Sequence, residues 1–293
     1  MSRGTSCSPA DFRKKHSAWF SPPARDRKRS TLKTTTILSL ETHSPEPAAP
    51  AFDERDLFPR AHARDRLVNS IFTMAAPYVD RLSRGFSLGL DRYWRQKAVS
   101  LSGVGPGNRV LDICAGTGEL SFILSRTVGP QGSVIGTDFC RSMLAIAEKK
   151  AQAGFANLSF LLADAKSLPF PDASFDAVTV SFGMRNIPDT ILALREIRRV
   201  LKPGGTFLCL ELTKPLSPLV RVAYSWYVFR FMPFVSGFFI KSRAPYQYLP
   251  RSIEAFYQPV EFCGVVARSG FVRVRSTSLT LGLATVYRAF KQR

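Results

Sequence analysis

Short apolar runs alternate with stretches of helical spacing along the middle of the chain. Apolar runs of this length between turn residues are typical of buried strands, and strands that alternate with helices predict a parallel sheet covered by helices on both faces. Residues 190–201 place apolar side chains at every third or fourth position, which predicts a helix that Lys202-Pro203-Gly204-Gly205 ends. The expected strands are residues 110–113, 133–138, 158–162, 175–181 and 206–212.

A turn of small residues follows the first expected strand and contains Gly116 and Gly118. A glycine turn between a strand and a helix brings backbone N–H groups against a ligand at the helix N-terminus. The second strand ends in Asp138, about 20 residues after the glycines, where nucleotide-binding folds hold ribose hydroxyls. The third glycine of a dinucleotide fingerprint is missing, because Glu119-Leu120-Ser121 follows Gly118. The pattern therefore predicts a nucleotide of another kind.

Acidic residues lie at or next to the ends of three successive expected strands, as Asp112, Asp138 and Asp164. Carboxylates suit a cationic ligand with ribose hydroxyls better than a pyrophosphate. S-adenosylmethionine (SAM), a sulfonium cation that carries adenosine, is such a ligand. The alternative is that the glycine pattern is only a tight turn of an α/β protein, and the placement of the later acids disfavours it.

Six segments carry a resemblance to a known family: residues 86–94, 114–119, 164–171, 181–186, 199–205 and 279–282. In these segments the chain resembles the C-methyltransferases of ubiquinone and menaquinone biosynthesis (the UbiE/MenG family), from about residue 65 to its end. The most specific part is Ser181-Phe182-Gly183-Met184-Arg185-Asn186 together with residues 199–205. The resemblance implies an α/β, Rossmann-like class I SAM-dependent methyltransferase with a mostly parallel seven-stranded sheet. The implied reaction moves a methyl group from SAM to a ring carbon of a polyprenylated hydroquinone, namely demethylmenaquinol, the equivalent ubiquinone precursor, or both.

The resemblance places SAM contacts at the turn and at the strand ends. We expect the two carboxylate oxygens of Asp138 to accept from the ribose hydroxyls. Asp164 would accept from the adenine amino group, and Ser181 would lie beside the methyl donor. The expected cofactor-binding residues are Gly116, Thr117, Gly118, Asp138, Asp164, Ala165 and Ser181.

Arg185 and Asn186 are the expected catalytic residues, in a mechanism that uses no metal. The acceptor ring must be reduced, because a hydroquinone is electron-rich and a quinone is not. Arg185 stays protonated in proteins, so it would hold the phenolate or orient a water rather than act as the base. The alternative for Arg185 is a surface ion pair. Asn186 would fix the neighbouring hydroxyl, and Asp80 or a bound water are the candidate proton acceptors.

The substrate-facing segments depart from the family pattern. The acids of the family are absent from Lys241-Ser242-Arg243-Ala244-Pro245-Tyr246, and Arg251 stands where the family carries Glu. The sequence therefore leaves open whether the acceptor is a benzoquinol or a naphthoquinol, and the length of its prenyl tail.

The net charge of +19 indicates an anionic partner. The first 50 residues carry nine Lys or Arg and four acids, which leaves +14 for the rest of the chain. An anionic membrane surface is the favoured partner. The alternative is that the positive charge only keeps the protein soluble. Nucleic acid is disfavoured, because the loop after the fourth strand holds neither an [DN]-P-P-[YF] motif nor a Pro-Cys pair. Another small-molecule methyltransferase, or a SAM-binding protein without catalysis, are further alternatives.

The expected organisation is a disordered basic extension over residues 1–50 and a methyltransferase domain over residues 51–293. Within the domain we expect residues 214–250 to form an insertion that covers the substrate. Its aromatic residues suit a lid or an interfacial helix, with an ordinary core helix as the alternative; they include Trp226, Phe229, Phe231 and Phe238.

The chain contains no uncharged apolar stretch long enough for a membrane-spanning helix. We therefore expect a cytoplasmic enzyme bound peripherally to the inner face of the cell membrane. If the extension is a transit peptide rather than a wrongly chosen start, an organelle is the alternative. A homodimer or a quinone-biosynthesis complex are the assemblies considered.

Overall fold

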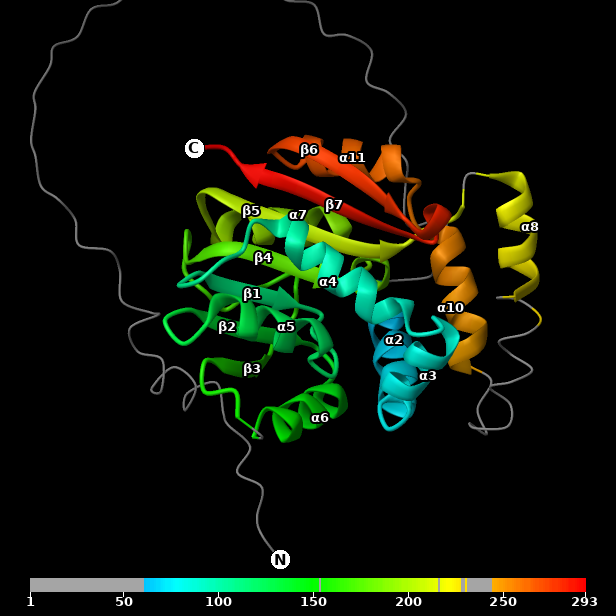
Figure 1. The fold of residues 1–293 in the computed structure, drawn as a ribbon, viewed down its shortest axis with the longest axis horizontal. Helices are drawn as coiled ribbons and strands as arrows, with labels where there is room; N and C mark the ends of the chain where they lie inside the picture. Colours follow the sequence, from blue (N-terminus) through cyan, green and yellow to red (C-terminus); the bar gives the residue numbers. More distant parts are fainter. Residues whose placement is uncertain (1–60, 153, 216, 228–229, 231–243) are drawn as a thin grey trace, which may run out of the picture.

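The computed structural model describes residues 61–152, 154–215, 217–227, 230 and 244–293, and the expected extension 1–50 lies outside them. Its centre is a seven-stranded sheet with the order β3-β2-β1-β4-β5-β7-β6 (Figure 1). Strands β1 to β5 pair in parallel, whereas β7 pairs antiparallel with both β5 and β6. The strands are β1 Arg109–Ile113, β2 Ser133–Asp138, β3 Leu158–Leu162, β4 Phe175–Ser181, β5 Leu201–Leu212, β6 Phe271–Leu279 and β7 Ala284–Lys291. The expected fold class is confirmed.

Alternation along each strand sends neighbouring side chains to opposite faces of the sheet. In β1, Val110 packs in one hydrophobic cluster, whereas Leu111 and Ile113 pack in the other. The first cluster is shared with the helices α4 Leu90–Ser102, α5 Glu119–Val128 and α6 Arg141–Ala151. The second is shared with α7 Thr190–Val200 and α11 Pro259–Arg268. Both faces of the sheet are therefore covered by helices, as expected for buried parallel strands.

The predicted helix before the fifth strand is present as α7, and it ends one residue earlier than expected. Asp189 caps it by accepting from the backbone N–H of Leu192 at 2.9 Å. Strand β5 begins at Leu201 instead of residue 206, because Leu201 pairs with Phe175 across an irregular register. The turn-like Lys202-Pro203-Gly204-Gly205 therefore interrupts the start of a strand rather than preceding it.

Four helices gather beyond the carboxyl ends of the parallel strands: α2 Ala61–Ala75, α3 Val79–Phe86, α8 Pro218–Trp226 and α10 Ala244–Ala255 (Figure 1). Two short 3-10 turns, η3 Met184–Asn186 and η5 Thr280–Gly282, follow β4 and β6. In the part of the chain that the structure describes, no helix is long and apolar enough to cross a bilayer. Phe229, Phe231 and Phe238 lie outside the described residues.

Candidate active site

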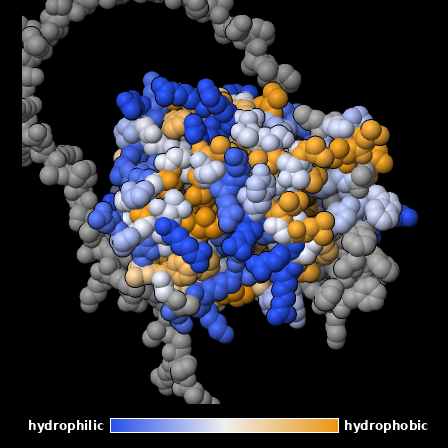
Figure 2. Space-filling view, viewed as in Figure 1, coloured by the Kyte–Doolittle hydropathy of each residue, from blue (hydrophilic) through white to orange (hydrophobic). Residues whose placement is uncertain are grey.

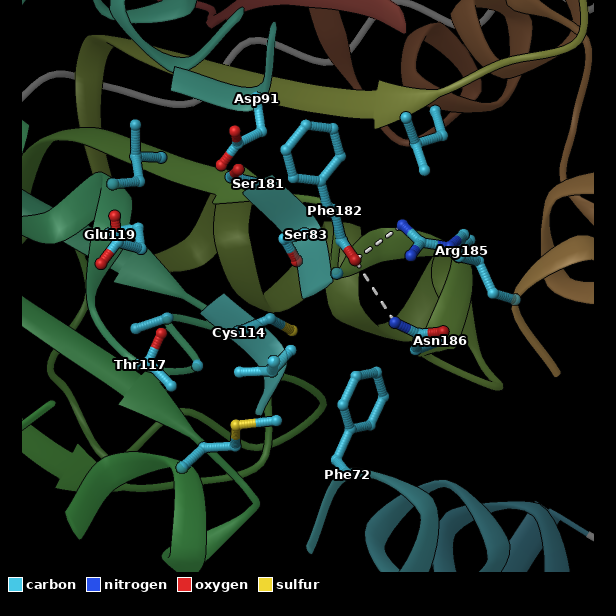
Figure 3. Close-up of a pocket in the computed structure, with 18 of the residues that line it drawn as sticks. Phe72, Ser83, Asp91, Cys114, Thr117, Glu119, Ser181, Phe182, Arg185 and Asn186 are labelled. Carbon is cyan, nitrogen blue, oxygen red and sulfur yellow. Dashed lines mark hydrogen bonds between the residues drawn. The ribbon is translucent and has the colours of Figure 1, made fainter. Parts of the chain in front are cut away.

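A cavity of about 650 Å³ lies between the strand ends and these four helices (Figure 3). In an open α/β sheet, ligands bind in this crevice outside the carboxyl ends of the strands. Both expected catalytic residues and all but one of the expected cofactor-binding residues line it, namely Gly116, Thr117, Asp138, Asp164, Ala165, Ser181, Arg185 and Asn186. Sequence positions as far apart as 116 and 186 are thus brought to one space.

Gly118 is the expected residue that does not line the cavity. It precedes α5 with a φ of +87°, which favours glycine. A Cβ atom at this position would lie 2.9 Å from Phe160 and 3.0 Å from Phe122. Gly118 therefore allows the helix to pack closely on the sheet, while Gly116 faces open space and leaves room for a ligand.

Asp138 is held rigidly at the end of β2. Its Oδ2 accepts from the Gly116 N–H at 2.8 Å, and its Oδ1 accepts from the Cys140 N–H at 2.9 Å. Burial raises the pKa of Asp138, and these backbone donors oppose the shift. A carboxylate has about four acceptor sites, so the side chain keeps acceptor capacity for a ligand hydroxyl.

The turn after β3 brings Asp164 and Ala165 to the same cavity. The Asp164 Oδ1 accepts from the Lys166 N–H at 2.9 Å, and the side chain is half exposed. Lys166 Nζ donates to Asp65 Oδ2 at 2.8 Å. This contact joins the turn to α2 and so closes one side of the cavity.

Asp112 plays a different part from the other two strand-end acids. It is 1% exposed, and its oxygens accept from the hydroxyls of Ser121 at 2.6 Å and Thr179 at 2.8 Å. Burial raises the pKa of Asp112 to about 6. It reaches the cavity wall, but its hydrogen bonds mainly join β1, β4 and α5.

Arg185 lies in the turn η3, and only 8% of it is exposed. Its Nη1 donates to the Phe182 carbonyl at 2.7 Å (Figure 3). The same Nη1 donates to Glu211 Oε2 at 2.7 Å. The alternative of a surface ion pair is therefore wrong, because the ion pair is buried. The guanidinium forms part of the cavity wall.

Asn186 lies beside Arg185 and points toward the same carbonyl (Figure 3). Its Nδ2 donates to the Phe182 oxygen at 3.4 Å. Tyr248 of α10 donates from its hydroxyl to Asn186 Oδ1 at 3.0 Å. The amide orientation is thus set from both ends.

Sequence reasoning missed Glu211 and Tyr248, whereas Tyr224 and Tyr227 belong to the aromatic stretch that was expected to form a lid or an interfacial helix. Glu211 is an acid in an otherwise apolar strand, a signal that could have marked it. Tyr224, Tyr227 and Tyr248 come from the expected insertion. Burial raises the pKa of Tyr224 to about 12, against the opposing charge of Arg185. The Tyr227 hydroxyl donates to the Phe86 carbonyl at 2.8 Å and joins the end of α8 to α3.

A second charged network joins α3 to the glycine turn. Asp80 accepts from the Thr117 hydroxyl at 2.5 Å and from Lys150 Nζ at 2.6 Å. Lys150 also donates to Glu119 at 2.8 Å and to the Thr117 carbonyl at 3.2 Å. Both oxygens of Asp80 are therefore engaged in holding the helix over the turn.

The donors and acceptors of the cavity fit SAM. Ser181 Oγ is buried at the end of β4 and has no hydrogen-bond partner among the described residues, so it can bond to a ligand. Asp138 offers acceptors for hydroxyls, and the open side of Gly116 allows close approach. Within the described ranges, no group of three or more His, Cys, Asp or Glu could hold a metal ion.

Comparisons with known proteins give the family. The family model described as the ubiE/COQ5 methyltransferase family matches residues 60–291. The chain belongs to the ubiE/COQ5 methyltransferase family. Demethylmenaquinone methyltransferases of Staphylococcus aureus, strains JH9 and Newman, are 37% identical over 231 residues, which span 79% of this chain and 95% of each relative.

Solved structures share the fold at lower sequence identity. A SAM-dependent methyltransferase from Aquifex aeolicus is 22% identical, with a TM-score of 0.52 over 69% of this chain and 91% of that one. The [4+2]-cyclase SpnF is 17% identical, with a TM-score of 0.57 over 77% and 95%. Family and fold together identify this member of the ubiE/COQ5 family as a SAM-dependent methyltransferase.

Proposed function

We propose that this ubiE/COQ5 family member methylates a ring carbon of a polyprenylated hydroquinone, either demethylmenaquinol or the equivalent ubiquinone precursor. The observation that carries the proposal is the buried Arg185, which lies in the wall of the cavity that holds the cofactor-binding residues. The 37% identity to a demethylmenaquinone methyltransferase supports the naphthoquinol. Aromatic side chains in the same wall suit an apolar acceptor; they include Phe72, Phe86, Tyr224 and Tyr227.

Gly116, Thr117, Asp138, Asp164, Ala165 and Ser181 would hold SAM. When bound there, SAM supplies an electrophilic methyl group on a sulfonium. The described part of residues 214–250 contributes Val220, Tyr224, Tyr227, Tyr248 and Leu249 to the cavity wall, which supports a substrate-covering role.

Arg185 would stabilise the negative charge that develops on the acceptor oxygen. A hydroquinone that loses a hydroxyl proton becomes a phenolate, whose ring carbon is a strong nucleophile. A guanidinium that is already fixed in a buried wall stabilises such an oxyanion without reorganising during the reaction. Asn186 would bind the neighbouring hydroxyl. Asp80 already accepts hydrogen bonds from Thr117 and Lys150. We therefore propose that a water beside Arg185, rather than Asp80, accepts the hydroxyl proton of the hydroquinone.

The experiment supplies purified protein with labelled SAM and either reduced or oxidised demethylmenaquinone, with a demethylated benzoquinol in parallel. We expect methylation of a ring carbon only in the reduced acceptor, with mass spectrometry identifying the product. Equal methylation of quinone and hydroquinone would contradict the phenolate mechanism. Methylation of added RNA, with no quinol product, would support the nucleic-acid alternative instead.

We also propose that the enzyme works at an anionic membrane, on the inner face of the cell membrane. Exposed apolar side chains lie on α8, where Leu219 is 85%, Val222 71% and Trp226 62% exposed. Figure 2 shows apolar side chains gathered at this edge of the molecule. The Tyr227–Phe86 hydrogen bond places the end of α8 beside α3, next to the cavity. An acceptor with a prenyl tail could therefore enter from the bilayer.

A further inference from the structure

Glu211 lies near the end of β5, an interior strand of the sheet, and its side chain is fully buried. It does not line the cavity, whereas Arg185 does. The carboxylate therefore lies behind the guanidinium, out of reach of an acceptor in the cavity. Burial raises the pKa of Glu211, and the charge and hydrogen bonds of Arg185 oppose that shift.

Glu211 holds Arg185 at two separate points. Its Oε2 accepts from Arg185 Nη1 at 2.7 Å, and its Oε1 accepts from the Arg185 backbone N–H at 3.3 Å. The Leu212 N–H donates to Oε2 at 3.1 Å, which fixes the carboxylate itself. The Glu211 side chain thus fixes both the backbone of the turn η3 and the guanidinium of Arg185.

A buried ion pair is weak evidence for a gain in stability, because desolvating two charges offsets much of their attraction. The same pair restricts where a guanidinium can point. Misplacing a catalytic group by about 1 Å can lower a rate by about 100-fold. A fixed counter-charge on the guanidinium therefore matters most for the positioning of Arg185, which lines the cavity.

We propose that Glu211 is a positioning residue for methyl transfer, which acts through Arg185 by fixing its guanidinium against the acceptor oxygen. This inference rests on the proposed role of Arg185. Glu211 takes no proton from the acceptor in this proposal, because it does not line the cavity.

The test compares Glu211→Gln and Glu211→Asp with the unchanged full chain. The glutamine side chain carries no charge, and its NH2 group cannot accept a hydrogen bond from Arg185. We therefore expect the turnover per folded molecule to fall by about 10- to 100-fold. SAM affinity and the KM for SAM should stay at their original values. Glu211→Asp keeps the charge and should recover part of the lost turnover, which also provides a measurement if the amide variant does not fold.

The matched control is Thr285→Val. Thr285 pairs with Glu211 across β5 and β7, is 1% exposed, and shares a hydrogen bond of 2.9 Å with Thr213. This variant loses a buried polar contact in the same strand pair without touching Arg185, so its turnover should match that of the unchanged chain. SAM-binding stoichiometry gives the folded fraction of every variant. A loss in Glu211→Gln that merely follows this fraction would overturn the inference.

A double variant separates the two claims. If Glu211 acts through Arg185, Arg185→Ala combined with Glu211→Gln should turn over no more slowly than Arg185→Ala alone. A further loss in the double variant would show an independent role and overturn the inference. If Arg185→Ala is slow while both Glu211 variants keep full turnover, only the positioning role fails. If Arg185→Ala itself keeps full turnover, the proposed function of Arg185 fails with it.

Discussion

The carboxylate of Asp138 is the group that we propose holds the ribose of SAM. Asp138→Ala removes both acceptors and also releases the Gly116 N–H from its partner. Losing such charge-assisted hydrogen bonds should cost about 1.5–3 kcal/mol, or roughly 10- to 150-fold in SAM affinity. Calorimetry checks the value. Asp172→Ala is the control, because it removes an exposed acid outside the cavity wall, and it should bind SAM normally. An unchanged Kd for SAM in Asp138→Ala would refute the role of Asp138 in ribose binding.

Arg185 is expected to contribute to turnover and not to SAM binding. Arg185→Ala removes the donor from the acceptor oxyanion, so turnover should fall by about 100-fold or more while the Kd for SAM stays constant. Arg185→Lys keeps the charge but loses the planar guanidinium, so its turnover should lie between that of the unchanged chain and that of Arg185→Ala. Steady-state kinetics with a reduced quinol measures both. Full activity of the alanine variant would leave Arg185 as the ion-pair partner of Glu211 only.

Asp112 makes stability depend on pH. Its pKa is raised from 3.8 to about 6 in the folded protein. The contribution of protonated Asp112 to the free energy of unfolding is therefore fully present below about pH 4. This contribution is lost as the pH rises through about 6, a decline of up to about 3 kcal/mol. Asp112→Asn cannot ionise, so its stability relative to the unchanged chain should increase over that range. Denaturant unfolding without SAM at pH 4.5 and 7.5 checks this, and a difference that does not vary with pH contradicts it.

At the scale of elements, polar bonds help to hold α3 as a wall of the cavity. None of its residues is fully buried, and Val79 packs only partly against a hydrophobic cluster, so the Asp80 contacts with Thr117 and Lys150 add to limited apolar packing. The ion pair is partly exposed, which limits its contribution. If SAM binds at the glycine turn as we propose, its binding and the position of α3 are linked through Thr117.

Asp80→Asn should loosen this helix. The amide keeps one acceptor for Thr117 and loses the attraction to Lys150, so SAM affinity should fall by about fivefold, or about 1 kcal/mol. Hydrogen exchange of residues 79–86 should become faster at the same time. Glu148→Gln, which breaks an exposed ion pair with Arg141 on α6, is the control. Unchanged exchange in α3 would show that packing against its neighbours suffices to hold it.

The five parallel strands could be predicted from the sequence because each is a local apolar run between turns. Strand β6 was not located, since it exposes most of its side chains and lacks such a run. Strand β7 was not located either, although most of its side chains are buried. Asp112 was grouped with the ligand acids because its position at a strand end resembles theirs. Glu211 and Arg185 lie 26 residues apart, and only the parallel pairing of β4 and β5 brings them together. Spacing in one sequence carries no information on that contact.

At the scale of the whole molecule, the net positive charge lies outside the cavity. The net charge of +19 includes +14 outside the first 50 residues. Among the described residues, the cavity wall holds more acidic than basic side chains, with Arg95, Lys166 and Arg185 as its basic ones. The positive charge is therefore available to the anionic surface that we propose as a partner. The exposed apolar side chains of α8 lie at the cavity end of the sheet (Figure 1), which is where an apolar acceptor would enter.

Membrane binding should follow from these two features together. Each Lys or Arg near an anionic surface contributes about 1 kcal/mol at moderate salt, so vesicle binding of the full chain should rise with the fraction of anionic lipid and fall with salt. Leu219→Ser with Trp226→Ala removes apolar burial worth about 1.5–3 kcal/mol per inserted side chain, and it should weaken binding at every salt concentration. Val272→Ser is the control, because Val272 is an exposed apolar residue on β6. It pairs with Phe290 near the C-terminus, at the opposite end of the sheet from α8 (Figure 1). Co-sedimentation measures all three proteins. If the unchanged chain stays in the supernatant with anionic vesicles at low salt, the acceptor must reach the cavity through water and the membrane proposal fails.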